Sequence, residues 1–269
     1  METPMVPYDP LRLSGPDSEG SGQNFRDNKP DFEFITKRTG LIGLFAALPL
    51  YFYLLPDVIL PYPVSWLAYR FGLTDPDTFS LFYNIIFQVI MIVFLLILFR
   101  NVLKQSFAGL KSYTPGYFLE CYGICYGAFF AANIVASLLT VLINGADSVS
   151  LNQQTIMNMT GTNPSAMAVM AILLGPVVEE LIFRGIIYRQ TRRFGKAAAI
   201  LVSSVTFGLT HVMGSVLSGN PRELLLVLPY VIMGVSLSVI YESRRNLLFP
   251  IIVHMTQNTL AILVMILLK

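Results

Sequence analysis

Three ionisable residues stand in a very apolar stretch of the sequence, GPVVEELIFRG at positions 175–185. Glu180 and Arg184 are four residues apart with the acid first, the order that favours an ion pair along one helix face. Glu179 points about 100° away from that pair, because a helix turns 3.6 residues per revolution. Its own position one turn on is Phe183. We therefore expect Glu180 and Arg184 to form a structural pair and Glu179 to remain a free carboxylate that can accept a proton.

A proline lies one turn before this carboxylate. Pro176 has no backbone N–H, so the carbonyl of Ile172 loses its hydrogen-bond donor. Inside a membrane such a break in the helix is tolerated where it lines a cavity or is covered by protein. We expect the helix to be opened beside Glu179.

The only two histidines of the chain also lie in apolar stretches. His211 stands in FGLTHV, with Phe207 one turn back on the same helix face. His254 stands in HMTQN, with Asn258 one turn on. Counting along the expected helices puts Glu179 and these polar groups roughly 10–20 Å from the cytosolic helix ends. They are thus expected to meet in one polar cavity near the bilayer centre, on its cytosolic side.

The elements that must position these residues are membrane-spanning helices. The chain has 269 residues, of which 54% are hydrophobic and 13% charged, and its mean hydropathy is +0.63. Soluble proteins average about 25% charged residues, so the composition predicts an all-α, polytopic transmembrane helical bundle. About seven membrane-spanning helices are expected, at 39–60, 79–101, 117–143, 165–189, 197–217, 222–241 and 247–268. The net charge of +2 gives no indication of nucleic-acid binding.

The orientation follows from the basic residues, which are enriched on the cytosolic side of membrane proteins. Residues 1–38 are polar and rich in Pro, Gly and Ser, typical of a disordered tail without a signal peptide; residues 39–269 form the transmembrane domain. This tail and the loops after the second, fourth and sixth helices hold most of the basic residues. They are Arg12, Arg26, Lys29, Lys37, Arg38, Arg100, Lys104, Lys111, Arg189, Arg192, Arg193, Lys196, Arg244 and Arg245. Only Arg70, Arg222 and Lys269 fall on the other side. The N-terminus is therefore expected in the cytosol and the C-terminus outside.

Three motifs in order carry a family resemblance. EELIFR fits EExxxR, FGLTH fits FxxxH and HMTQN fits HxxxN, on three separate predicted helices. Together they resemble the CPBP family of intramembrane proteases (also called Abi), which includes the Ras-converting CAAX endopeptidase. The resemblance covers about residues 165–260 and departs from the family at none of the motif positions.

The resemblance implies a role for each motif residue. Glu179 and His211 would activate a water molecule, while His254 and Asn258 would stabilise the oxyanion. Glu180 and Arg184 would hold the site together, with Phe207 in support. The implied function is an intramembrane endopeptidase of CAAX-protease type, acting on prenylated or other membrane-anchored peptides in the lipid bilayer. A multi-pass protein of a bacterial plasma membrane is the expected location.

Two alternatives remain open. Glu179, His211 and His254 are ligand types that suit a catalytic zinc, although no HExxH motif is present; the resemblance to a CAAX endopeptidase favours a glutamate mechanism without a metal or other cofactor. Buried ionisable residues also occur in proton-coupled transporters, or the same fold could serve as a non-catalytic bacteriocin-immunity protein. The absence of a visible repeat argues against a transporter, and the intact motifs argue against loss of activity.

Overall fold

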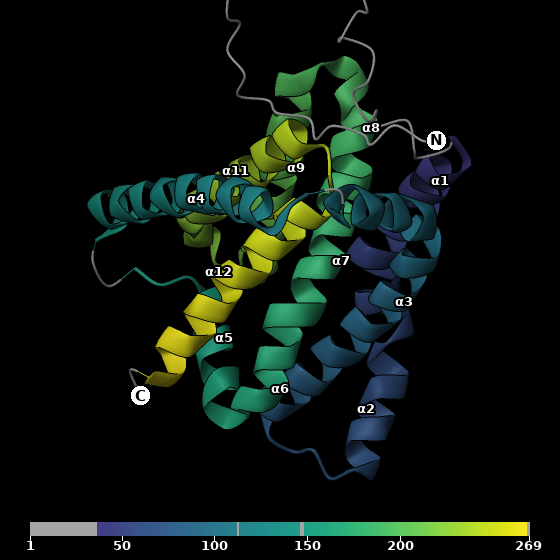
Figure 1. The fold of residues 1–269 in the computed structure, drawn as a ribbon. Helices are drawn as coiled ribbons and strands as arrows, with labels where there is room; N and C mark the ends of the chain where they lie inside the picture. The colour runs from purple at the N-terminus through teal and green to yellow at the C-terminus, as the bar shows by residue number, and fades with distance from the viewer. Residues whose placement is uncertain (1–36, 112, 146–147, 268–269) are drawn as a thin grey trace, which may run out of the picture.

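The structure is a computed structural model that describes residues 37–111, 113–145 and 148–267 (Figure 1). Within these residues every regular element is helical, which confirms the predicted all-α bundle. Six of the described helices are long and apolar enough to cross a membrane, and a further apolar helix, Lys196–Thr210, is shorter. The polar tail predicted at 1–38 lies outside the described residues, except for its last two.

The first three predicted spans are all helical. α1 (Lys37–Ile42) continues into the wider π-helical segments η2 (Gly43–Ala47) and η3 (Leu50–Ile59). The helix therefore widens around Pro49 and Pro56 and does not end there. A short helix follows, and then two helices longer than predicted. They are α2 (Pro61–Arg70), α3 (Pro76–Lys111) and α4 (Pro115–Asn144).

The span that carries the two glutamates is one continuous helical run over 164–194. It begins with α6 (Pro164–Ala168) and contains the ordinary helix α7 (Gly175–Ile182), with a π-helical segment on each side. These segments are η4 (Val169–Leu174) and η5 (Phe183–Tyr188), and the run ends with α8 (Arg189–Thr191) and η6 (Arg192–Phe194). α7 is thus a short regular helix between two distortions.

The fifth predicted span, 197–217, is wrong in its second half. α9 (Lys196–Thr210) ends just before His211, and the short helix α10 (Met213–Leu217) follows after a turn. The side chains of Thr210 and His211 both hydrogen-bond the carbonyl of Phe207, at 2.6 and 2.9 Å. The N–H of His211 bonds Gly208 instead, at 3.2 Å. Side chains that compete for a backbone carbonyl in this way end helices.

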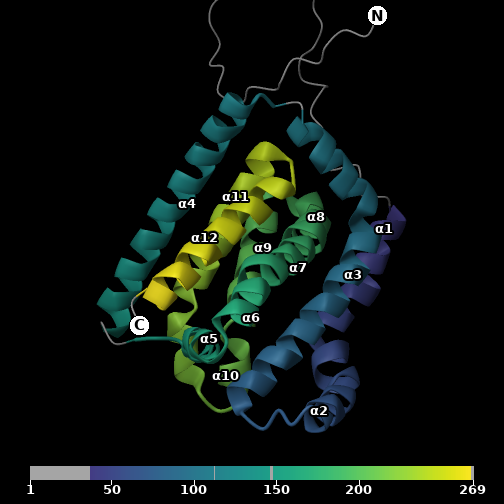
Figure 2. The same cartoon turned by 60° about the horizontal axis from the view of Figure 1, so that its bottom comes forward.

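The remaining elements complete the bundle. The helix α5 (Leu151–Thr162) lies in a region where no helix was predicted. The sixth span is divided into the 3-10 helix η7 (Pro221–Leu226) and α11 (Leu228–Arg244). α12 (Leu248–Leu267) is the last, close to its predicted bounds. Figure 2 shows α7, α9, α11 and α12 gathered between the long helices α3 and α4.

Glycines allow α9 and α11 to lie unusually close. A Cβ atom added to Gly234 would stand 2.8 Å from the Cα of Ser204, and one added to Gly208 would stand 3.1 Å from the backbone nitrogen of Val231. Small residues at such positions are typical of membrane helix pairs, where packing of backbones replaces the hydrophobic driving force. This contact brings the carbonyl of Gly234 within reach of Arg184.

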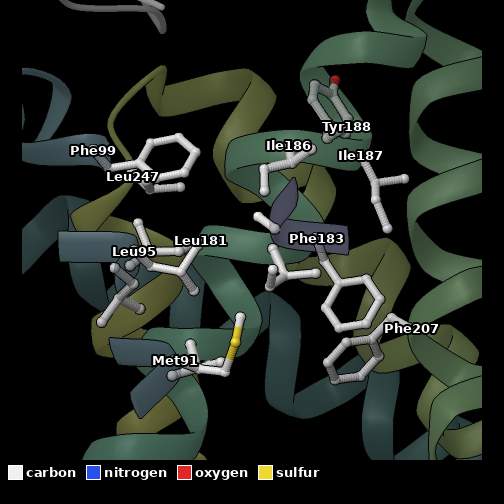
Figure 3. Packing of buried hydrophobic residues seen from close by; sticks show 14 of the residues in the cluster. Met91, Leu95, Phe99, Leu181, Phe183, Ile186, Ile187, Tyr188, Phe207 and Leu247 are labelled. Atoms are coloured by element: carbon white, nitrogen blue, oxygen red, sulfur yellow. The ribbon is translucent and has the colours of Figure 1, made fainter. Parts of the chain in front are cut away.

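Apolar packing fixes α7 and η5 against their neighbours. Figure 3 shows Leu181 beside Leu95 of α3, and Phe183 lying against Phe207 of α9. The two phenyl rings meet edge to face, with centroids 5.1 Å apart. All four of these residues are fully buried. The backbone on both sides of the glutamates is therefore held by a close-packed interior.

Polar contacts join the basic loops at one end of the bundle. Arg192 forms an ion pair with Glu242 at 2.9 Å, and Asn246 donates to the carbonyl of Ser106 at 2.8 Å. The loops after the second, fourth and sixth spans thus share one end, as the charge pattern requires. Which side of the membrane that end faces stays a prediction.

Candidate active site

The predicted ion pair is present and completely buried. A guanidinium nitrogen of Arg184 lies 2.8 Å from Oε1 of Glu180, and both side chains have 0% exposure. A second nitrogen of Arg184 donates to the carbonyl of Gly234 at 2.9 Å, and the guanidinium lies 5.0 Å above the ring of Phe207. The cation therefore ties α7 to both α9 and α11.

His254 joins the two glutamates. Its Nδ1 lies 3.0 Å from Oε1 of Glu180, and its Nε2 lies 3.7 Å from Oε2 of Glu179. A carboxylate only accepts hydrogen bonds, so Nδ1 donates its proton to Glu180. The separation between Nε2 and the carboxylate of Glu179 is longer than a hydrogen bond, so this side of the ring lies beside Glu179 without bonding it. The carboxylate expected to be free thus has His254 as a close neighbour.

Glu179 keeps the partial access that acid–base chemistry requires. Its side chain is 18% exposed, whereas Glu180 beside it is fully buried. The buried phenol of Tyr51, from η3, lies close enough to interact electrostatically with it. Glu179 is therefore partly accessible, while Glu180 is enclosed by the protein.

His211 is held in one orientation at the end of α9. Its Nδ1 lies 2.9 Å from the carbonyl oxygen of Phe207. Because a carbonyl can only accept, the proton of the neutral ring is on Nδ1, and Nε2 carries the lone pair. The same Phe207 packs against both histidines, with centroids 4.7 Å from His211 and 6.0 Å from His254.

Asn258 contacts the distorted backbone two turns before Glu179. Its side-chain nitrogen donates to the carbonyl of Ala171 at 2.8 Å. In η4 the N–H of Gly175 bonds Met170, five residues back. The next donor in that wider register would be position 176, where the proline has none. The helix is therefore opened next to Pro176, as predicted. The carbonyl that loses its backbone donor and gains a side-chain partner is that of Ala171, however, and not that of Ile172.

The structure thus brings most of the predicted residues together. Glu179, His254 and the buried ion pair form one connected cluster, and His211 joins it across the ring of Phe207. Asn258 lies one turn further along α12 than His254, and its side chain donates to the carbonyl of Ala171, earlier in the span that carries Glu179. Tyr51 and Tyr230 also lie in contact range of these residues, and neither belongs to the three motifs.

The described residues do not assemble a metal site. Within them, no group of three or more His, Cys, Asp or Glu side chains is arranged to hold a metal ion. Nδ1 of His211 and Nδ1 of His254 bond the carbonyl of Phe207 and Glu180, which leaves Nε2 of both rings as the possible ligand atom. Glu179, His211 and His254 do not form such a group as they stand, and the choice between a zinc and a metal-free mechanism stays a prediction.

The part of the chain that contains this cluster is similar to one protein family and to two known membrane proteins. Residues 161–260 match the family described as "Type II CAAX prenyl endopeptidase Rce1-like". The chain is 27% identical over 187 residues to "Putative membrane peptidase YdiL" of Bacillus subtilis (strain 168), covering 67% of this chain and 70% of that protein. It is 29% identical over 132 residues to "Membrane-embedded CAAX protease MroQ" of Staphylococcus aureus (strain USA300), covering 46% of this chain and 49% of that one. No solved structure gives a significant match.

The matched segment contains every motif residue from Glu179 to Asn258. It leaves out the first four described helices and with them Tyr51. Over residues 161–260 the chain is therefore similar to the Rce1-like CAAX prenyl endopeptidases, which confirms the resemblance predicted from the three motifs.

Proposed function

We propose that this protein is an intramembrane endopeptidase of CAAX type that cleaves membrane-anchored, prenylated peptides with a water molecule activated by Glu179 and His211. One observation carries the proposal. A partly accessible carboxylate, Glu179, lies 3.7 Å from His254 inside a helical membrane protein, and His211 packs against the same Phe207 ring as His254. The similarity to a protein named as a membrane-embedded CAAX protease supports the same activity.

The proposed reaction begins at Glu179. Its carboxylate takes a proton from a water molecule, whose oxygen attacks the carbonyl carbon of the scissile peptide bond. The C–N bond then breaks, and Glu179 gives the proton to the leaving nitrogen. His211, with Nε2 as the free acceptor, helps to orient the same water molecule.

Two donors on α12 face the negative charge that develops on the carbonyl oxygen. We assign this role to Nε2 of His254, in the state in which the ring carries a proton on both nitrogens, and to the side-chain amide of Asn258. Donors held in place before the reaction are more effective than mobile water, and losing one typically costs about 2.7–4 kcal/mol. Glu180 holds Nδ1 of His254 at 3.0 Å, so it sets the direction of the opposite nitrogen.

The proposal includes a location and partners. The protein is a multi-pass membrane protein, and we propose a bacterial plasma membrane with the N-terminus in the cytosol. The site would then open toward the cytosolic half of the bilayer. A peptide anchored by a lipid reaches such a site by lateral diffusion, with its lipid in the hydrocarbon region.

The test compares matched glutamine variants in proteoliposomes. Glu179→Gln removes the base while changing packing little. Glu120→Gln, on the exposed part of α4, is the control for the same substitution. The substrates are a farnesylated CAAX peptide and the same peptide without the lipid, and cleavage is followed by mass spectrometry. We expect Glu120→Gln to match the wild type and Glu179→Gln to lose cleavage by at least about a hundredfold, the lower range for a general base.

The outcomes separate the rival functions. Cleavage by Glu179→Gln at the wild-type rate would refute the assignment of the base. A wild-type protein that cleaves neither peptide, nor any membrane peptide in a comparison of membrane peptidomes with and without it, would refute the protease proposal. Proton uptake coupled to solute entry would then favour a transporter.

A further inference from the structure

Tyr230 stacks on the ring of His211, with centroids 4.5 Å apart and an angle of 18° between the two planes. The ring of Phe207 also packs against the imidazole, with centroids 4.7 Å apart and an angle of 49°. Tyr230 comes from α11 and Phe207 from α9, so His211 is held between two helices.

The hydroxyl of Tyr230 is itself fixed from a third element. It lies 2.7 Å from the hydroxyl of Ser150 and 3.2 Å from the side-chain nitrogen of Asn152. Ser150 is the N-terminal cap of α5, where its side chain accepts from the N–H of Gln153. The N–H of Leu151, the first residue of α5, donates to both carboxylate oxygens of Glu223 at 3.2 Å. Tyr230 thus connects His211 to the capped start of α5.

We propose that Tyr230 is a positioning residue that sets the direction of Nε2 of His211. This inference rests on the proposed function of His211 but uses a residue outside the three motifs. The reason is geometric. The hydrogen bond from Nδ1 to Phe207 fixes one point of the ring, and the ring can still tilt about that point. A parallel ring at 4.5 Å removes the tilt, so both restraints together define where Nε2 points.

The need for such a restraint follows from where His211 stands. It lies at the C-terminal cap of α9, where the backbone leaves the helix and turns toward α10. Residues three and four positions further on, whose side chains would lean back over the ring inside a helix, lie beyond the end of α9. A misplacement of about 1 Å at a reacting group costs up to about a hundredfold in rate. The tyrosine face also favours a cation beside it, so its loss would change how readily the imidazole takes up a proton.

The experiment separates the stacking from the hydroxyl. Tyr230→Phe keeps the aromatic ring and loses the hydroxyl contacts to Ser150 and Asn152. Tyr230→Leu loses the aromatic ring as well as these contacts. Tyr62→Leu is the matched control, since Tyr62 is 89% exposed on α2. For the full-length protein in proteoliposomes we expect Tyr230→Leu to lower kcat at least about tenfold with little change in KM. Tyr230→Phe should retain most of kcat. The pH profile of kcat should shift only in Tyr230→Leu.

A second measurement does not depend on activity. Because the chain has two histidines, protein with isotope-labelled histidine gives two sets of imidazole NMR signals, which a His254→Gln variant assigns. We expect the ring signals of His211 to move downfield in Tyr230→Leu, as the shielding by the stacked ring is lost. The ratio of its two tautomers should change as well. Tyr62→Leu should leave both unchanged.

The failure of this inference and that of the proposed function give different results. Unchanged imidazole signals in Tyr230→Leu would refute the positioning role, whatever the enzyme does. A kcat and a pH profile equal to those of the wild type in Tyr230→Leu would also refute the positioning role. If Glu179→Gln is inactive in the same assay, the protease proposal stays intact. Altered His211 signals in a protein that cleaves no peptide would refute the protease proposal alone.

Discussion

Replacing Glu180 by glutamine is expected to lower the free energy of unfolding by about 3–5 kcal/mol, the cost of breaking a fully buried ion pair. One carboxylate oxygen, Oε1, accepts from both Arg184 at 2.8 Å and His254 at 3.0 Å. Hydrogen bonds to charged groups contribute about 1.5–3 kcal/mol each, against about 1 kcal/mol for neutral ones. The substitution weakens two such bonds and removes the carboxylate paired with the buried guanidinium. Arg184 retains its contacts with the carbonyl of Gly234 and the face of Phe207.

The assay is reversible unfolding of the purified protein in mixed micelles as the fraction of denaturing detergent is raised. Glu120→Gln serves as the matched control and should change stability by less than about 0.5 kcal/mol, as exposed sites usually do. A double variant, Glu180→Leu with Arg184→Leu, removes both charges together. It should be more stable than either single variant, because apolar replacements of a buried pair are often nearly neutral.

Two results would refute this reasoning. A loss of less than about 1 kcal/mol in Glu180→Gln would mean that the pair is solvated in the membrane and its burial costs little. A double variant that loses the sum of the two single losses would mean that the residues are not coupled, since coupled neighbours deviate from additivity by about 0.5–3 kcal/mol.

Three further predictions concern packing, orientation and metal. Gly234→Ala should destabilise by about 1–3 kcal/mol in the same unfolding assay, because the new Cβ would stand 2.8 Å from the backbone of Ser204; Gly214→Ala, with no atom within 4 Å, should be neutral. A cysteine at position 269 should react with a membrane-impermeant label added outside cells, and labelling from the cytosolic side only would reverse the predicted orientation. Exhaustive chelation should leave cleavage intact, and stoichiometric zinc whose removal stops turnover and whose return restores it would contradict the metal-free mechanism.

Local spacing was enough to predict the ion pair, because Glu180 and Arg184 lie four residues apart on one helix face with the acid first. The depth of the two histidines in the bilayer stays a prediction. The length of the apolar stretches located six of the seven spans, since a bilayer imposes helix lengths that composition reveals, although α3 (Pro76–Lys111) extends well past its predicted end at 101.

The rest depends on contacts between distant elements. The bridge from His254 to Glu180 joins residues 74 positions apart, and no periodicity contains that information. The end of α9 at Thr210 arises because side chains of Thr210 and His211 take the carbonyl of Phe207, within a sequence apolar enough to continue as a helix. The stacking of Tyr230 on His211 depends on how closely α9 and α11 approach.

The two π-helical segments on either side of α7 divide the glutamate span into three parts that are out of phase. Each wide turn takes one residue more than an ordinary turn, so the side chains beyond it are set back by about 100° on the helical wheel. The segment η4 contacts α12 and α3, whereas the segment η5 contacts α9. A wheel drawn at constant pitch through 164–194 would therefore assign wrong neighbours to part of the span. Deleting a single residue from either wide turn would rotate the Glu179 carboxylate relative to His254 or to His211, so the site depends on the length of this span as well as on its hydrophobicity.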